Sequence, residues 1–150
     1  NLGNNETWDT HGNAFHRLKN KLFPPTERAL CALLDDLEES GMLDETLIVI
    51  GGEFGRTPKL STLTESFTEP GRDHWGACYS SVLAGGGIQG GRIHGASDNL
   101  AAYVRDLPVS VYDFQATILH AFGLKPEAAV PDETGRPVRI SDGQPVLELF

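Results

Sequence analysis

One stretch decides the fold, Thr46-Leu-Ile-Val-Ile-Gly-Gly-Glu-Phe-Gly-Arg-Thr-Pro58. Its first five residues are all apolar or β-branched, which predicts a central strand covered on both faces. The paired glycines that follow let the chain turn sharply at the carboxyl end of this strand, where open α/β sheets place their ligands. Glu53 and Arg56 come directly after that turn. They could hold a metal ion and an anion, or they could simply pair with each other across the loop.

Length and charge narrow the class of protein. The 150 residues, 39% of them hydrophobic, are enough for one domain with a core and too few for two ordinary domains. The 12 basic and 21 acidic residues give a net charge of -9 that is spread along the chain. Nucleic acid and anionic membranes are therefore poor partners. No run approaches the roughly 18 apolar residues of a membrane-spanning helix.

Helical patterns precede the central strand. Residues 15–22 carry apolar side chains at helical spacing, and Pro24-Pro25 is expected to end that helix and to begin the next one. Residues 30–37 form an amphipathic stripe, which predicts a helix lying on a sheet. Gly41 should end this second helix, as a glycine after the last helical turn commonly does.

Further elements follow in the second half of the chain. Ser110 opens a Ser-x-x-acid pattern that predicts a helix start, and Phe122 should face the core from that helix. A small hairpin is expected near the end, turning at Asp142-Gly143. His94 alternates with an apolar residue in an expected exposed strand and is interpreted as structural. The order of helices and strands predicts an α/β domain.

Side chains able to bind metal collect at strand ends and beside glycines. Asp9 and His11 lie two residues apart and would share a face in extended chain. The loop Gly71-Arg-Asp-His-Trp75 adds another imidazole directly before the second apolar strand. Two carboxylates and two imidazoles suit Zn²⁺, Mn²⁺ or similar divalent ions. The candidate metal ligands are Asp9, His11, Glu53 and His74.

Two arginines accompany these ligands. Arg56 and Arg72 present guanidinium forks, which recognise phosphate or sulfate oxygens in bidentate geometry. A metal ion beside arginines suits the hydrolysis of an anionic ester, because the arginines neutralise charge that grows in the transition state. Ion pairs between neighbouring residues, such as Glu53 with Arg56, remain the structural alternative.

Five stretches of the chain carry a family resemblance. They are Trp8–Asn13, Asp44–Pro58, Gly71–Trp75, Leu83–Ile88 and Gly135–Val138. In order over nearly the whole chain, they resemble the C-terminal half of a bacterial sulfatase-like domain-of-unknown-function family, which is similar to the alkaline phosphatase and arylsulfatase superfamily. The resemblance implies a three-layer α/β/α sandwich. Residues 1–150 would be the C-terminal part of that one domain, and the part bearing the nucleophile would precede residue 1.

The resemblance also assigns roles to the candidate residues. Asp9 and His11 resemble the first metal-binding pair of the superfamily, Glu53 takes the place of the Asp after the central strand, and His74 resembles the final His. Phe54 stands where the superfamily has a second His and cannot bind metal. The resemblance therefore implies a divalent metal (Zn, Mn, Ca or Mg), with one ion favoured over two.

The function implied is a metal-dependent hydrolase of sulfate or phosphate esters, present here as the metal-binding half and inactive alone. Its substrate would be a small anionic ester or a sulfated glycan. By resemblance the whole protein would be periplasmic or on the cell surface. Exposed apolar strand edges could lead to self-association. The alternative is a non-catalytic binding or scaffold domain that keeps the fold and has lost the chemistry.

Overall fold

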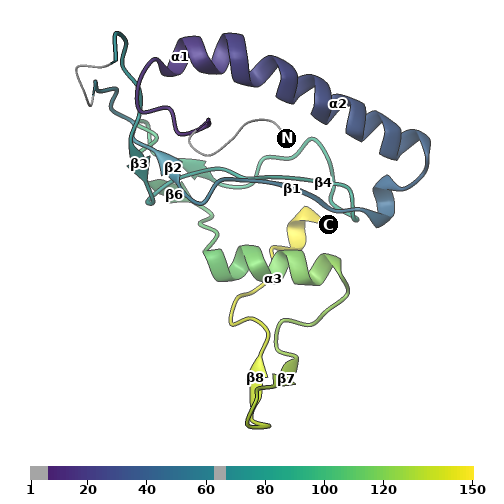
Figure 1. The fold of residues 1–150 in the computed structure, drawn as a ribbon. Helices are drawn as coiled ribbons and strands as arrows, with labels where there is room; N and C mark the ends of the chain where they lie inside the picture. Colours follow the sequence, from purple (N-terminus) through teal and green to yellow (C-terminus); the bar gives the residue numbers. More distant parts are fainter. Residues whose placement is uncertain (1–6, 63–66) are drawn as a thin grey trace.

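The computed structural model describes residues 7–62 and 67–150 and has a mixed α/β architecture (Figure 1). A long helical segment lies along one side, most of the short strands lie in the middle, a second helix lies on the other side, and the last pair of strands extends beyond that helix (Figure 1). Within the described ranges, no helix combines the length and apolar content needed to cross a bilayer. In chain order the elements are α1 (Ala14–Arg17), the π-helix η1 (Leu18–Leu22), α2 (Phe23–Glu39), the 3₁₀ turn η2 (Leu43–Glu45), β1 (Ile48–Ile50), β2 (Gly55–Arg56), β3 (His74–Trp75), β4 (Val82–Ala84), β5 (Ala96–Ser97), β6 (Val104–Asp106), α3 (Val111–Ala121), β7 (Ala129–Pro131), β8 (Pro137–Arg139) and the 3₁₀ turn η3 (Leu147–Leu149).

The N-terminal helical segment runs without a break from Ala14 to Glu39. The prediction that Pro24-Pro25 would end a first helix is therefore wrong. Both prolines lie in the first turn of α2, where a missing N–H group is tolerated. The π-helical turn η1 directly precedes α2, and the chain stays helical although the two prolines cannot donate hydrogen bonds.

The end of α2 follows the prediction. Gly41 has a φ of 72°, and its N–H group donates to the carbonyl of Glu38. The N–H group of Met42 donates to the carbonyl of Leu37 at 2.9 Å. These two bonds form a Schellman motif, which satisfies carbonyls that the helix itself leaves without partners. Leu37 is buried on the amphipathic face, whereas Leu33 is 47% exposed.

The described strands form four separate antiparallel pairs: β1 with β4, β2 with β3, β5 with β6, and β7 with β8. The prediction of a central strand covered on both faces is wrong for β1. Within the described residues it pairs with β4 alone, and Val49 and Ile50 are 41% and 40% exposed. The α/β class is confirmed. The three-layer sandwich is not confirmed, because these short pairs do not join into one sheet.

Helix α3 begins with the predicted cap. The Ser110 hydroxyl accepts a hydrogen bond from the Asp113 N–H at 3.1 Å, and the Asp113 carboxylate accepts one from the Ser110 N–H at 3.1 Å. This is a complete capping box. The prediction that Phe122 faces the core is wrong, because this residue lies just beyond the last helical turn and is 72% exposed. Ala116 and Thr117 are the side chains that α3 buries.

The predicted hairpin at Asp142-Gly143 is wrong. The turn between β7 and β8 is built instead on Asp132, whose carboxylate accepts hydrogen bonds from the N–H groups of Thr134 and Arg136 at 2.9 and 3.0 Å. An aspartate that bonds the backbone two residues on is a common turn-forming device. Asp142-Gly143 lies against the start of α3, where a Cβ on the glycine would come within 2.0 Å of the Tyr112 carbonyl oxygen.

Candidate metal centre

Two backbone segments meet closely to build the candidate centre. The Arg72 N–H group donates to the Thr10 carbonyl at 3.2 Å. Beside this bond, a Cβ on Gly71 would lie 2.3 Å from the carbonyl carbon of His11, so only glycine fits at this position. The loop that carries His74 is thereby held beside the Asp-Thr-His segment of the N-terminal region.

A third segment arrives through the pair formed by β2 and β3. Arg56 lies opposite His74 in the register of this pair. Gly55 permits the close approach of β2 to the segment at Cys78, because a Cβ there would lie 2.2 Å from the Cys78 carbonyl oxygen. Side chains that are far apart in the sequence therefore share one site.

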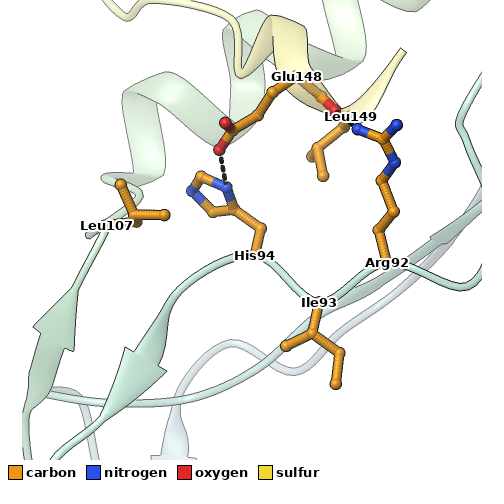
Figure 2. Close-up of a pocket in the computed structure, with 6 residues that line it drawn as sticks. All are labelled: Arg92, Ile93, His94, Leu107, Glu148 and Leu149. Carbon is orange, nitrogen blue, oxygen red and sulfur yellow. Dashed lines mark hydrogen bonds and ion pairs between the residues drawn. The ribbon is translucent and has the colours of Figure 1, made fainter.

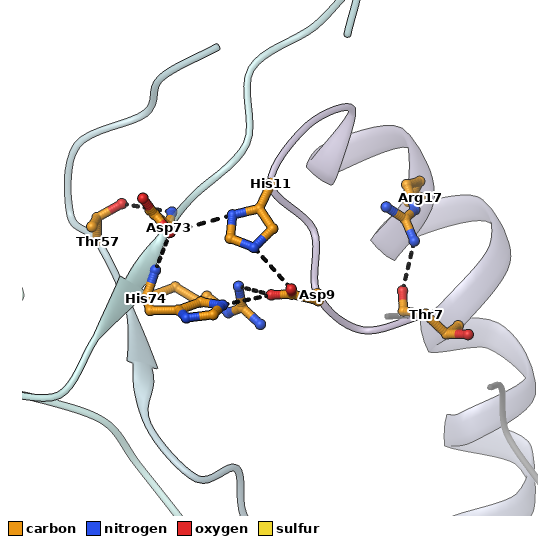
Figure 3. A network of polar contacts seen from close by, with 8 residues as sticks. Thr7, Asp9, His11, Arg17, Thr57, Asp73 and His74 are labelled. Atoms are coloured by element: carbon orange, nitrogen blue, oxygen red, sulfur yellow. Dashed lines mark hydrogen bonds and ion pairs between the residues drawn. The ribbon is translucent and has the colours of Figure 1, made fainter. Parts of the chain in front are cut away.

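Asp9 contacts polar side chains of this site through both of its carboxylate oxygens (Figure 3). Nε2 of His11 donates to one carboxylate oxygen of Asp9 at 2.8 Å, and Nε2 of His74 donates to the other at 3.0 Å. The guanidinium of Arg56 forms an ion pair with Asp9 as well. The Asp9 side chain keeps 30% of its surface exposed. A half-buried carboxylate thus faces three groups that carry, or can carry, positive charge.

The partners of Asp9 determine its ionisation. Burial alone would raise the pKa of this carboxyl, because desolvation disfavours the charged form. The hydrogen bond from His74, the hydrogen bond and charge of Arg56, and the hydrogen bond from His11 together outweigh burial. They lower the pKa of Asp9 to about 2. Asp9 is therefore an anion, and available as a ligand, at any physiological pH.

Asp73 orients His11 from the side opposite Asp9 (Figure 3). Nδ1 of His11 lies 3.3 Å from the Asp73 carboxylate, but it is buried without a hydrogen bond of good geometry. Asp73 is itself fixed, since its carboxylate accepts from the His74 N–H at 2.8 Å and its own N–H donates to the Thr57 hydroxyl at 3.0 Å. A histidine that binds metal through one nitrogen commonly donates its other N–H to a carboxylate.

Aromatic packing fixes the second imidazole. The ring of Phe54 lies 4.2 Å from the ring of His74, measured between centroids, and the two imidazoles lie 4.9 Å apart. The Arg56 guanidinium lies 5.8 Å from the centre of the Phe54 ring. Phe54 cannot bind a metal ion, yet it packs against a side chain that can. The sequence patterns gave no indication of this positioning role, nor of the role of Asp73.

The residues suit a cation in both number and chemistry. One ligand atom from each of Asp9, His11 and His74 lies within 4.8 Å of the others. One carboxylate and two imidazoles form a common donor set for zinc and related ions. An ion on Nε2 of His11 would also leave the proton on Nδ1, where Asp73 could accept it. The buried Nδ1 that lacks a good partner therefore fits a metal centre.

The remaining candidates lie around this group. Glu53 is exposed in the bend before β2 and is not part of the three-residue group, so its metal role stays a prediction. Arg56 is held by Asp9. The Arg72 side chain is half-buried, and in the described part of the chain no hydrogen bond or ion pair engages it. Both arginines line a groove that borders the centre.

A second cavity, of about 250 Å³, lies near the C-terminus (Figure 2). His94 forms an ion pair with Glu148 there, and Arg92 donates to the Glu148 carbonyl at 2.8 Å. These polar groups satisfy one another and tie η3 to the loop at residues 92–94, so His94 is structural, as predicted. It does not lie in an exposed strand, however, because its side chain is only 14% exposed and it belongs to no strand.

Fold and site together define an α/β domain with a candidate divalent-cation centre made of one carboxylate and two imidazoles. The chain belongs to the family described as "Protein of unknown function (DUF1501)", whose family model matches residues 2–150. No curated protein and no solved structure is significantly similar to the chain. Membership in the alkaline phosphatase and arylsulfatase superfamily does not follow from this match.

Proposed function

We propose that the chain is the metal-binding part of a sulfatase-like hydrolase that cleaves sulfate or phosphate esters. The proposal includes the three-layer α/β/α sandwich of the alkaline phosphatase type as the fold of the whole domain. It also includes a periplasmic or cell-surface location and a single divalent ion, Zn, Mn, Ca or Mg. Small anionic esters or sulfated glycans are the proposed substrates.

One observation carries the proposal. Both oxygens of the Asp9 carboxylate accept Nε2–H groups of imidazoles, at 2.8 and 3.0 Å, from segments that lie more than 60 residues apart. A structural ion pair needs only one positively charged partner for Asp9, whereas this arrangement gathers three possible metal ligands, one carboxylate and two imidazoles, around one point. When bound, a divalent ion would polarise an ester oxygen or activate a nucleophile.

The chain's own residues would bind and orient the anionic group of the substrate. Arg72 has a guanidinium without a protein partner in the described ranges, so it can bind sulfate or phosphate oxygens at no cost in existing contacts. Arg56 lies on Asp9 and would share its charge between that carboxylate and the substrate. Asp73 would hold the His11 ring in one orientation.

A second candidate is a non-catalytic binding or scaffold domain. Phe54 supports it, because its ring packs against His74, with centroids 4.2 Å apart, and cannot serve as a further metal ligand. The ion pair of Asp9 with Arg56 also neutralises the carboxylate without any metal. Under this candidate the cluster stabilises the loops and binds no ion.

Metal content separates the two candidates. We expect elemental analysis of the purified, unchelated protein to find near-stoichiometric divalent metal, and the His74→Ala variant to have lost it. His16→Ala is the matched control, because His16 is exposed on α1 and should leave the metal in place. Absence of metal from the unmodified protein, or retention in His74→Ala, would reject the site and favour the binding domain.

A further inference from the structure

A groove of about 600 Å³ borders the candidate centre. Thr10, which lies between two of the candidate ligands, forms part of its lining, as do apolar residues from the N-terminal helical segment. Phe15 and Phe23 stand out among these, since 54% and 53% of their surfaces are exposed. Trp8 packs against Phe23, with ring centroids 6.0 Å apart. The groove therefore presents aromatic surface to a ligand that reaches the centre.

The charges of the groove have the opposite sign to the charge of the chain. Lys19, Arg56 and Arg72 line it together with a single carboxylate, Glu27, although the chain as a whole has a net charge of -9. Arg56 is engaged by Asp9. Within the described ranges, nothing pairs with the side chains of Lys19 or Arg72. A local excess of cations in an acidic protein favours an anionic ligand.

We propose that this groove binds the apolar alcohol part of an anionic monoester, with the sulfate or phosphate group at Arg72 and Arg56. The inference rests on the proposed function and narrows its substrate class. An alkyl chain or a fused ring system would cover Phe15, Leu18 and Phe23, and burying such surface is favourable. A glycan would place hydroxyl groups against this apolar wall, where they would lose hydrogen bonds to water without replacement.

Calorimetric titration with two probes of equal charge tests the proposal. The probes are 2-naphthyl sulfate, which has an apolar body, and glucose 6-sulfate, which has a polar one. We expect the protein to bind 2-naphthyl sulfate about tenfold more tightly. Phe15→Ala should remove most of this preference, and Phe23→Ala should act in the same direction. Both side chains are half exposed, so folding should survive. The control Phe122→Ala replaces an exposed ring far along the chain and should change nothing.

The arginine needs a separate variant. Arg72→Gln should weaken both probes by a similar factor, because both carry the same sulfate group. Arg28→Gln, which removes an exposed charge on α2, is its control. Equal affinity for the two probes, or a preference that survives both phenylalanine variants, would overturn the proposal.

Titrations with and without EDTA separate this inference from the proposed function. A preference for 2-naphthyl sulfate in a protein that never contains metal would support the groove while the hydrolase proposal fails. Bound metal together with equal affinity for the two probes would leave the hydrolase proposal standing and overturn the groove.

Discussion

Two aspartates, Asp9 in the candidate centre and Asp113 at the start of α3, have lowered pKa values for different reasons. The N–H of Gln144 and the hydroxyl of Ser110 lower the pKa of Asp113 most, and the N–H of Ser110 lowers it further, against an opposing effect of burial that is larger than this last contribution. Each of these donors belongs to a helix start or to the chain docked on it. The carboxylate of Asp113 therefore has a structural purpose that its contacts explain completely.

Asp9 differs in the kind of partner. Its hydrogen bonds come from two imidazoles and its ion pair from a guanidinium, and it neither begins nor ends a helix or strand. Imidazoles and carboxylates that contact one another can instead bind a metal ion placed between them, whereas backbone N–H groups cannot bind one. The direction of a pKa shift thus does not identify a functional carboxylate. The chemistry of its partners does.

The largest effect should follow from Gly71→Ala. A Cβ at this position would lie 2.3 Å from the His11 carbonyl carbon, so the N-terminal segment must move away from the loop that carries His74. We expect loss of metal binding and a loss of stability of about 1–3 kcal/mol, measured by metal titration and urea unfolding. Gly76→Ala is the control, because nothing lies within 4 Å of the added atom. If Gly71→Ala bound metal normally, the close approach would not be what assembles the centre.

The second prediction concerns the start of α3, the region compared with the candidate centre. Ser110→Ala removes the hydroxyl of the capping box and should cost about 1 kcal/mol, seen as a fall in melting temperature of about 2–4 °C. Metal affinity should not change, because α3 contributes no ligand to the three-residue group. Ser80→Ala, at an exposed position, serves as the control. A parallel loss of metal binding would show that the two regions are coupled.

The sequence predicted features that nearby residues determine. The start of α3 at Ser110 and the end of α2 at Gly41 depend on side chains and backbone angles within a few residues, so local patterns sufficed. The turn at Asp132 and the π turn η1 were missed. In both cases two local signals competed: in the tail, Asp142-Gly143 competed with the turn that begins at Asp132, and before α2 the prolines could begin a helix as well as end one.

The candidate centre was predictable as a list of residues and not as an arrangement. Asp9, His11 and His74 were identified from their chemistry and their places beside glycines, and the structure brings these three together. The meeting depends on Gly71 and on the register of β2 with β3, which no periodicity encodes. Whether a side chain such as Glu53 turns inward depends on the conformation of the bend that carries it, which residue types alone do not determine. The sequence leaves that choice open.

The smallest effect concerns the charge of Asp113. Because its pKa is lowered in the folded chain, its ionised form adds stability above the unfolded pKa of about 3.9, and this contribution is lost as the pH falls through the folded value. Asp113→Asn keeps an acceptor oxygen but not the charge, so it should cost less than about 1 kcal/mol near neutral pH. The difference from the unmodified protein should shrink below about pH 4.

Urea unfolding at pH 7, 5 and 3 measures this difference. Asp35→Asn, which changes an exposed carboxylate on α2, is the control. If the difference in unfolding free energy stays constant with pH, Asp113 stabilises α3 through its shape and hydrogen bonds alone. Charge would then distinguish Asp9 from Asp113.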